Sequence, residues 1–417
     1  MISFRKFRRT AVGLAALLLG VTACASGSSG SNNTGPIRIA LLAPLTGKFP
    51  NFGEFMSEGA ETGVAAVNAS GGVNGRKLVL DLVDTQGDPV DATPAFQEEM
   101  AINQPVALMG PTDLEIHALQ PLFDRSNIVD LFSGGDTTYD TNKDKLIFRI
   151  NPSDSQLGVA MALLAQKQGY KKAAIISSTG AGSQELLSVI QSTFAKLGGT
   201  IVTNVPISEA QTSYRSEVLQ VIDSHPDVIF VQCSPGTAGT LFGNFREVGG
   251  FAIPFIGTDS TATPDWVTAL TPAVAHQVLT SVVGSSAPGG GGVTFDQFYK
   301  QRYPTKTAPA AGTNQIYDAV IDLALAMTYA GGTSTAGIEA ALPKVSNPPG
   351  DVVTSYAAGI AELKAGKKIN YDGASGPLDF NQYQNVFGAF DVVKANTDGT
   401  FQTLETLTAA DLLAATS

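Results

Sequence analysis

Cysteine and histidine are scarce in this chain, and their scarcity narrows its chemistry. The 417 residues include two cysteines, Cys24 and Cys233, and three histidines, His117, His225 and His276. Two distant cysteines supply neither a disulfide framework nor a metal cluster. Three scattered histidines leave few general bases. We therefore expect no metal site and no cofactor.

Motifs of the common hydrolytic enzymes are also missing. The sequence has no Gly-x-Ser-x-Gly elbow and no His-Glu-x-x-His pair. The glycine run Gly289–Gly292 lacks the lysine and the spacing of a phosphate-binding loop, so we interpret it as a flexible loop. We predict that the protein is not an enzyme. An exported enzyme that uses paired carboxylates stays open as a weaker alternative.

Positive charge and long apolar runs are limited as well. Charged residues make up 15% of the chain, hydrophobic residues 43%, and the formal net charge is −11. This composition is typical of globular proteins, and the length favours about two domains. The acidic balance argues against nucleic acid or an anionic membrane surface as the main partner. Beyond the first 23 residues, no apolar run is long enough to span a bilayer.

The first 23 residues have the pattern of an export leader. Four basic residues between positions 5 and 9 precede a short apolar core, and their removal would take the net charge from −11 to −15. The core ends in Val21-Thr22-Ala23-Cys24, which resembles a bacterial lipobox, and residues 24–36 form a Ser- and Gly-rich tether. We predict lipid attachment at Cys24, on the outer face of the cell membrane. The general secretory and twin-arginine routes both stay open.

Short apolar runs that end at turn residues alternate with helical stretches. Val106–Met109 ends at Gly110-Pro111, and Ile128–Phe132 ends at Ser133-Gly134-Gly135. Such runs predict parallel strands buried on both faces. A second series follows Asn151, so we predict an α/β protein with two similar lobes.

Ligands of open parallel sheets bind beyond the carboxyl ends of the strands. Residues 110–115, 133–137 and Asp259 follow such ends. Thr112 and Glu115 have the spacing of a capping box, which we favour over a ligand role. Asp259 either binds a cationic ligand group or caps the helix expected over Thr261–Leu270.

Several motifs, in their order and spacing, resemble one known family. They are IRIALLAPLTG from Ile37, NASGGVNGRKLVL from Asn68, DTQGDP from Asp84, Gly110-Pro111, Ser133-Gly134-Gly135, INPSD from Ile150, FIGTDS from Phe255 and GPLDF from Gly376. The chain is similar to type I periplasmic binding proteins of the branched-chain amino acid (leucine/isoleucine/valine) family, which are ABC transporter substrate-binding lipoproteins. The resemblance implies two Rossmann-like lobes with parallel sheets, joined by three crossover strands and closing on the ligand.

The same resemblance suggests how the chain is divided. We expect a signal peptide over 1–23, a tether over 24–36, an N-terminal lobe over 37–152 and 283–385, and a C-terminal lobe over 153–282 and 386–417. The crossovers would then lie near Asn151, Val283 and Gly388.

The resemblance also implies ligand contacts. Leu114 falls where the family has a serine, and Thr112 could supply a substitute hydroxyl. The family's aromatic cover maps near Gly182 and Ser234, and neither residue is aromatic, which points to a roomier or more polar pocket than leucine needs. The predicted contacts are Thr112, Ser133, Gly135, Thr137, Ser234 and Asp259, the last receiving the ligand's ammonium group.

These observations predict a solute receptor. We expect a monomer that captures a branched-chain amino acid, another amino acid, an amide or a related small polar compound and delivers it to the permease subunits of an ABC importer. A ligand sensor that signals through a partner protein would use the same clamp and stays open.

Overall fold

The computed structural model describes residues 35–416, apart from residues 48, 180, 286–289 and 311. The predicted leader, Cys24 and the tether as far as residue 34 lie outside the described residues. No helix in the described part of the chain is long and apolar enough to cross a membrane.

The first lobe is built on a five-stranded sheet. Its strands are β1 (Ile37–Ala43), β2 (Leu78–Asp84), β3 (Ala107–Met109), β4 (Val129–Phe132) and β5 (Ile147–Arg149). They are all parallel and lie in the order β2-β1-β3-β4-β5. Every residue of β3, β4 and β5 is buried, as expected for strands covered on both faces.

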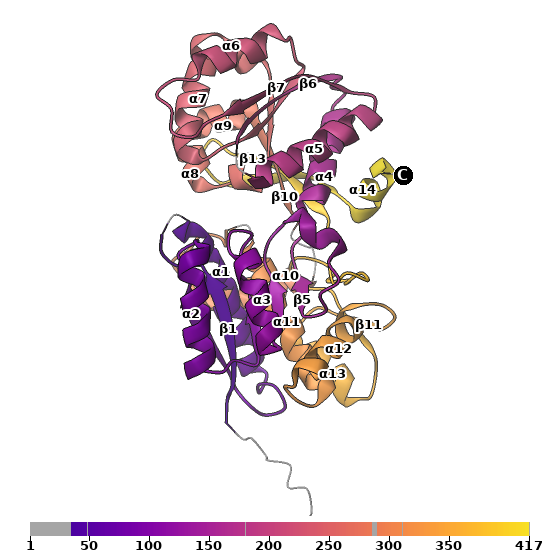
Figure 1. Cartoon of the computed structure of the whole chain (residues 1–417). Coiled ribbons are helices and arrows are strands. Elements are labelled where there is room, and N and C mark those ends of the chain that lie inside the picture. The colour runs from indigo at the N-terminus through magenta and orange to yellow at the C-terminus, as the bar shows by residue number, and fades with distance from the viewer. Residues whose placement is uncertain (1–34, 48, 180, 286–289, 311, 417) are drawn as a thin grey trace, which may run out of the picture. The chain divides into compact units, whose positions relative to one another are not determined.

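Helices from two distant parts of the chain cover this sheet (Figure 1). The early ones are α1 (Pro50–Ala69), α2 (Pro89–Ile102), α3 (Ile116–Ser126) and the short 3-10 helix η1 (Thr137–Thr141), and the late ones are α10 (Gly290–Arg302), α11 (Thr313–Ala330), α12 (Thr335–Ser346) and α13 (Tyr356–Lys364). A small parallel sheet of β11 (Asp351–Val353) and β12 (Ile369–Tyr371) accompanies them.

Close helix packing explains how α11 joins this lobe. A Cβ atom on Gly59 of α1 would lie 2.3 Å from the Thr313 carbonyl oxygen, and one on Gly63 would lie 2.7 Å from Val320 Cβ. Glycine at these two positions therefore lets α1 approach the backbone of α11. Every residue of α11 from Thr313 to Met327 is buried, so this helix forms the centre of the core.

The second lobe contains a seven-stranded sheet. Its strands are β6 (Lys172–Ser178), β7 (Thr200–Ile207), β8 (Val228–Gln232), β9 (Phe255–Gly257), β10 (Leu279–Gly284), β13 (Phe390–Ala395) and β14 (Phe401–Leu407), in the order β14-β13-β10-β9-β8-β6-β7. The five strands β7-β6-β8-β9-β10 repeat the parallel arrangement of the first sheet. The pair β13 and β14 is antiparallel, and it forms the hairpin that Asp398-Gly399 between two alternating runs predicts.

The helices of the second lobe come from residues 154–278 and 409–416. They are α4 (Asp154–Lys167), α5 (Ala181–Lys196), α6 (Arg215–Asp223), α7 (Pro235–Glu247), η2 (Gly250–Ala252), η3 (Asp259–Thr261), α8 (Pro264–Leu270), α9 (Pro272–Val278) and α14 (Ala409–Thr416). With the repeated sheets, they confirm the predicted α/β fold of two Rossmann-like lobes.

The segments that pass between the lobes lie side by side. Val386 N–H donates to the Arg149 carbonyl at 3.2 Å, and Ser285 N–H donates to the Ala389 carbonyl at 3.0 Å. A Cβ on Gly388 would lie 2.4 Å from Pro152 Cγ. These contacts tie together the chain after β5, after β10 and before β13, in agreement with the predicted three crossovers.

The glycine run does not form the loop that we predicted. Gly290–Gly292 begin α10, whereas Gly289 lies outside the described residues. A Cβ on Gly291 would lie 2.2 Å from the Gly373 carbonyl oxygen. The glycine at this position therefore permits close packing rather than flexibility.

Candidate functional site

Asp113 follows β3, and its carboxylate contacts the backbone of the loop that follows β4. Asp113 Oδ2 accepts Gly135 N–H at 3.1 Å, and its Oδ1 accepts Asp136 N–H at 3.0 Å. A Cβ on Gly134 would lie only 2.1 Å from Asp113 Oδ1, so glycine permits this approach. The surrounding protein removes much of the hydration of the Asp113 carboxylate and raises its pKa to about 6. The two N–H groups oppose this shift, and the residue keeps contact with water.

Asp154, the first residue of α4, approaches the same loop. Its N–H donates to the Gly135 carbonyl at 2.8 Å, and a Cβ on Gly135 would lie 2.3 Å from Asp154 Oδ1. Loss of hydration raises the pKa of Asp154 well above its ordinary value, and the charges of Asp113 and Asp259 raise it further. Carboxylates from both sheets thus act on one another at this place.

Asp259 follows β9 and remains accessible to water. Its Oδ1 accepts Ser260 N–H at 2.7 Å, and the protein around it raises its pKa. The helix that follows begins at Pro264, where Thr263 Oγ1 accepts Trp266 N–H at 3.4 Å. The capping alternative for Asp259 is therefore wrong, because Thr263 occupies the cap.

Thr112 and Glu115 form a buried polar pair. Glu115 Oε2 accepts both Thr112 N–H at 3.1 Å and the Thr112 hydroxyl at 2.6 Å, while its Oε1 accepts the Thr85 hydroxyl at 2.6 Å. The bond from Thr112 N–H to the Glu115 carboxylate is one of the two bonds of the predicted capping box. The Thr112 hydroxyl accepts Leu114 N–H at 3.3 Å as well, so both its donor and an acceptor position are engaged.

The three other contacts predicted in the first lobe, Ser133, Gly135 and Thr137, differ in their hydrogen bonds. Ser133 is 8% exposed at the end of β4, and within the described residues its hydroxyl has no hydrogen-bond partner. Thr137 begins η1. Both backbone groups of Gly135 are engaged, by Asp113 and by Asp154.

Ser234 caps α7 in the second lobe. Its hydroxyl donates to Glu209 Oε2 at 2.6 Å and accepts Thr237 N–H at 3.3 Å. Burial opposes ionisation of Glu209, but its bonds from Ser234 and Thr237 together hold its pKa below the ordinary value. Ser234 therefore orients a carboxylate that the sequence did not mark as a candidate.

Arg149 is a second residue that our sequence reasoning missed. It is 1% exposed, donates from Nη1 to the Asp136 carbonyl at 3.0 Å and from Nη2 to Asp140 Oδ1 at 2.7 Å. Asp140 Oδ2 in turn accepts the Ser155 hydroxyl of α4 at 2.5 Å. The signal was a single arginine inside the apolar run of β5, which requires a buried partner.

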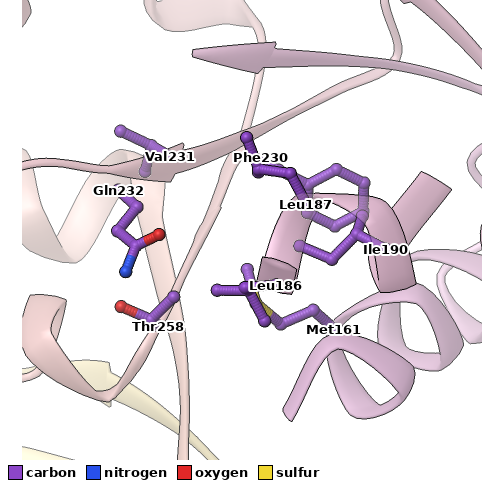
Figure 2. A pocket seen from close by; sticks show the side chains of 8 residues that line it. All are labelled: Met161, Leu186, Leu187, Ile190, Phe230, Val231, Gln232 and Thr258. Atoms are coloured by element: carbon purple, nitrogen blue, oxygen red, sulfur yellow. The ribbon is translucent and has the colours of Figure 1, made fainter. Parts of the chain in front are cut away.

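An apolar pocket of the second lobe is lined by α4, α5 and the ends of β8 and β9. Figure 2 shows Gln232 and Thr258 on one side of it and the apolar side chains of Met161, Leu186, Leu187 and Ile190 on the other. The pocket is packed too closely to admit a water molecule, so it belongs to the core. Gln232 Oε1 and the Ser177 hydroxyl next to it in the sheet are buried without a partner among the described residues.

The acidic groups do not form a metal site. Within the described residues, no three His, Cys, Asp or Glu side chains are placed to hold a metal ion. Asp113, Asp136, Asp154 and Asp259 are instead suited to a ligand that donates hydrogen bonds or carries positive charge.

Comparison with known proteins agrees with this architecture. Residues 36–400 match the family model described as periplasmic binding protein. The chain belongs to this family. The predicted type I fold and the predicted relation to the branched-chain amino acid group are thereby confirmed, and members of the family act outside the cytoplasm.

Individual relatives cover most of the chain. The chemotactic signal transduction system substrate-binding protein BasB of Halobacterium salinarum is 25% identical over 82% of this chain and 83% of its own length. The Leu/Ile/Val-binding protein BraC3 of Rhizobium johnstonii is 24% identical over 80% and 93%. The leucine-binding protein LivK of Thermotoga maritima has the same fold, with a TM-score of 0.74 and 20% identity over 90% of this chain and 99% of its own. These relatives are substrate-binding proteins.

Proposed function

We propose that this periplasmic binding protein captures a small polar solute between its two lobes and delivers it to the permease subunits of an ABC importer. The observation that carries the proposal is the convergence of polar groups from both sheets. Asp113 follows β3, Asp259 follows β9, and both act on the pKa of Asp154. A ligand held by both groups of residues would favour the closed arrangement, because it gains contacts that the open arrangement lacks.

The moving bodies in this proposal are residues 37–152 with 283–385 and residues 153–282 with 386–417. The hydrogen bonds near Arg149, Ser285 and Gly388 support a hinge at the crossovers. The lipobox-like sequence supports attachment through Cys24 to the outer face of the membrane, where a monomer can reach the importer.

A ligand screen tests the proposal. Purified protein is heated with amino acids, amides, urea, small amines and small carboxylates, because a ligand that binds only the folded state raises the melting temperature. Small-angle scattering then compares the free and saturated protein. We expect a solute that raises the melting temperature and lowers the radius of gyration. A saturating solute that leaves the radius unchanged would contradict closure, and a screen without binding would contradict the receptor function.

Sensing is the second candidate, and the likeness to BasB favours it. A receptor of that kind would present its closed form to a signalling protein instead of a permease. Deleting the gene separates the two functions. Loss of uptake of the radiolabelled solute supports transport, whereas unchanged uptake with loss of movement toward the solute supports sensing.

A further inference from the structure

The loop after β4 presents two neighbouring backbone donors, the N–H groups of Gly135 and Asp136. Both point at a carboxylate of the protein itself, since Asp113 accepts one at 3.1 Å and the other at 3.0 Å. Two adjacent N–H groups are well suited to a carboxylate, and such charge-assisted bonds are roughly twice as strong as neutral ones. A ligand carboxylate at this place would have to displace Asp113.

The Asp113 bonds are not needed to cap the helical turn that follows. The turn that starts η1 already has its own cap, because Asp136 Oδ1 accepts Thr138 N–H at 2.8 Å and the Thr138 hydroxyl at 2.7 Å. The chain also keeps glycine at position 134, where any Cβ would clash with Asp113 Oδ1. The close approach therefore depends on two separate segments, one that supplies Asp113 and one that supplies Gly134.

The charges around Asp113 also disfavour a ligand carboxylate at this place. The charge of Asp136 raises the pKa of Asp113, and the charges of Asp113, Asp259 and Asp136 raise the pKa of Asp154. Arg149 is the nearby cation that opposes them, and its Nη atoms are committed to Asp140 and to the Asp136 carbonyl. His117 Nε2 lies 2.7 Å from Asp136 Oδ2. An anionic ligand group would therefore be repelled, whereas an ammonium or amidinium group would be attracted.

We propose that Asp113 is a specificity-determining residue that takes the place of a ligand carboxylate, so that the solute is an organic cation without a carboxylate group. This inference rests on the proposed function, since it concerns the same site. The cation would lie among Asp113, Asp154 and Asp259 and would offset their mutual repulsion. The unpartnered Ser133 hydroxyl adds a neutral contact at the end of β4.

Three probes that share one side chain and one ammonium group test the inference. They are leucine, leucinamide and 3-methylbutylamine, and calorimetry at pH 7.5 compares them on wild type, Asp113→Ala and the exposed control Asp223→Asn. We expect wild type and the control to bind the amine and the amide at least tenfold more tightly than leucine. Asp113→Ala should shift this ratio at least tenfold toward leucine, because it frees the Gly135 and Asp136 N–H groups.

The possible results distinguish failure of this inference from failure of the proposed receptor function. Wild type that binds leucine as tightly as 3-methylbutylamine overturns the inference, as does an unchanged ratio in folded Asp113→Ala. If Asp113→Ala does not fold, the wild-type ratio and Asp113→Asn decide. If the probes fail but another solute of the screen binds, an organic cation without a carboxylate supports the inference, and a carboxylate or an uncharged solute overturns it while the receptor function stands. Binding of no solute overturns both.

Discussion

A buried carboxyl of the first lobe should make the stability of the protein depend on pH. Asp322 lies in α11 with 0% of its surface exposed, Ser346 Oγ donates to its Oδ1 at 2.8 Å, and its Oδ2 has no partner among the described residues. Burial raises its pKa to about 8, with a smaller contribution from the charge of Asp318, while the Ser346 bond opposes the shift. In an unfolded chain the pKa of aspartate is about 4.

The sign of the effect follows from these two pKa values. Between about pH 4 and pH 8 the folded protein keeps the Asp322 proton, whereas the unfolded chain releases it. The contribution to stability is therefore fully present below about pH 4 and is lost as pH rises toward about 8. One proton corresponds to about 1.4 kcal/mol per pH unit, so the loss from pH 5.5 to 7.5 is about 2.5 kcal/mol.

Asp322→Asn removes the proton but keeps the oxygen that accepts from Ser346. Urea denaturation at pH 5.5, 6.5 and 7.5 gives the free energy of unfolding of wild type, Asp322→Asn and the exposed control Asp223→Asn. We expect the control to follow wild type and Asp322→Asn to lose about 2.5 kcal/mol less across this range. Parallel losses in Asp322→Asn and wild type would refute the argument, because Asp322 would then have the same protonation in both states.

Two other predictions concern packing and the anchor. Gly63→Ala should destabilise the protein by about 1–3 kcal/mol, because the added Cβ would lie 2.7 Å from Val320 Cβ. Gly243→Ala in α7 is the control: nothing lies within 4 Å of its added Cβ, so it should be neutral or stabilising by up to about 1 kcal/mol. Equal urea midpoints for the two variants would contradict the prediction for Gly63. Cys24→Ala should move the protein from the membrane to the soluble fraction of cells, and a variant that stays with the membrane would contradict lipid attachment at Cys24.

The sheets could be predicted because their signals are local. A buried parallel strand is a short apolar run, and β4 has such a run with turn residues directly after it. The hairpin of β13 and β14 followed from Asp398-Gly399 between alternating runs. The helices α12 and α13 were missed although Ser334 and Ser355 cap them, since the surrounding segment has mixed polarity and its burial depends on contacts with α11.

The site could be predicted only as a set of strand ends. Residues 110–115 and 133–137 do come together, because parallel strands end at one edge of the sheet. That Asp113 would occupy the Gly135 and Asp136 N–H groups depends on an approach of two loops 22 and 23 residues apart in sequence. The role of Arg149 depends on η1, which places the Asp136 carbonyl and Asp140 within its reach.

Calorimetry of Asp259→Asn beside wild type and Asp223→Asn, with the solute found in the screen, tests the capture of a ligand between the lobes most directly. A charge-assisted hydrogen bond contributes roughly 1.5–3 kcal/mol, so loss of the Asp259 charge should weaken binding about ten- to hundredfold. Folding should be preserved, because Thr263 caps the following helix. We expect this loss of affinity in Asp259→Asn alone, and equal affinities in all three proteins would contradict capture of the ligand between the lobes.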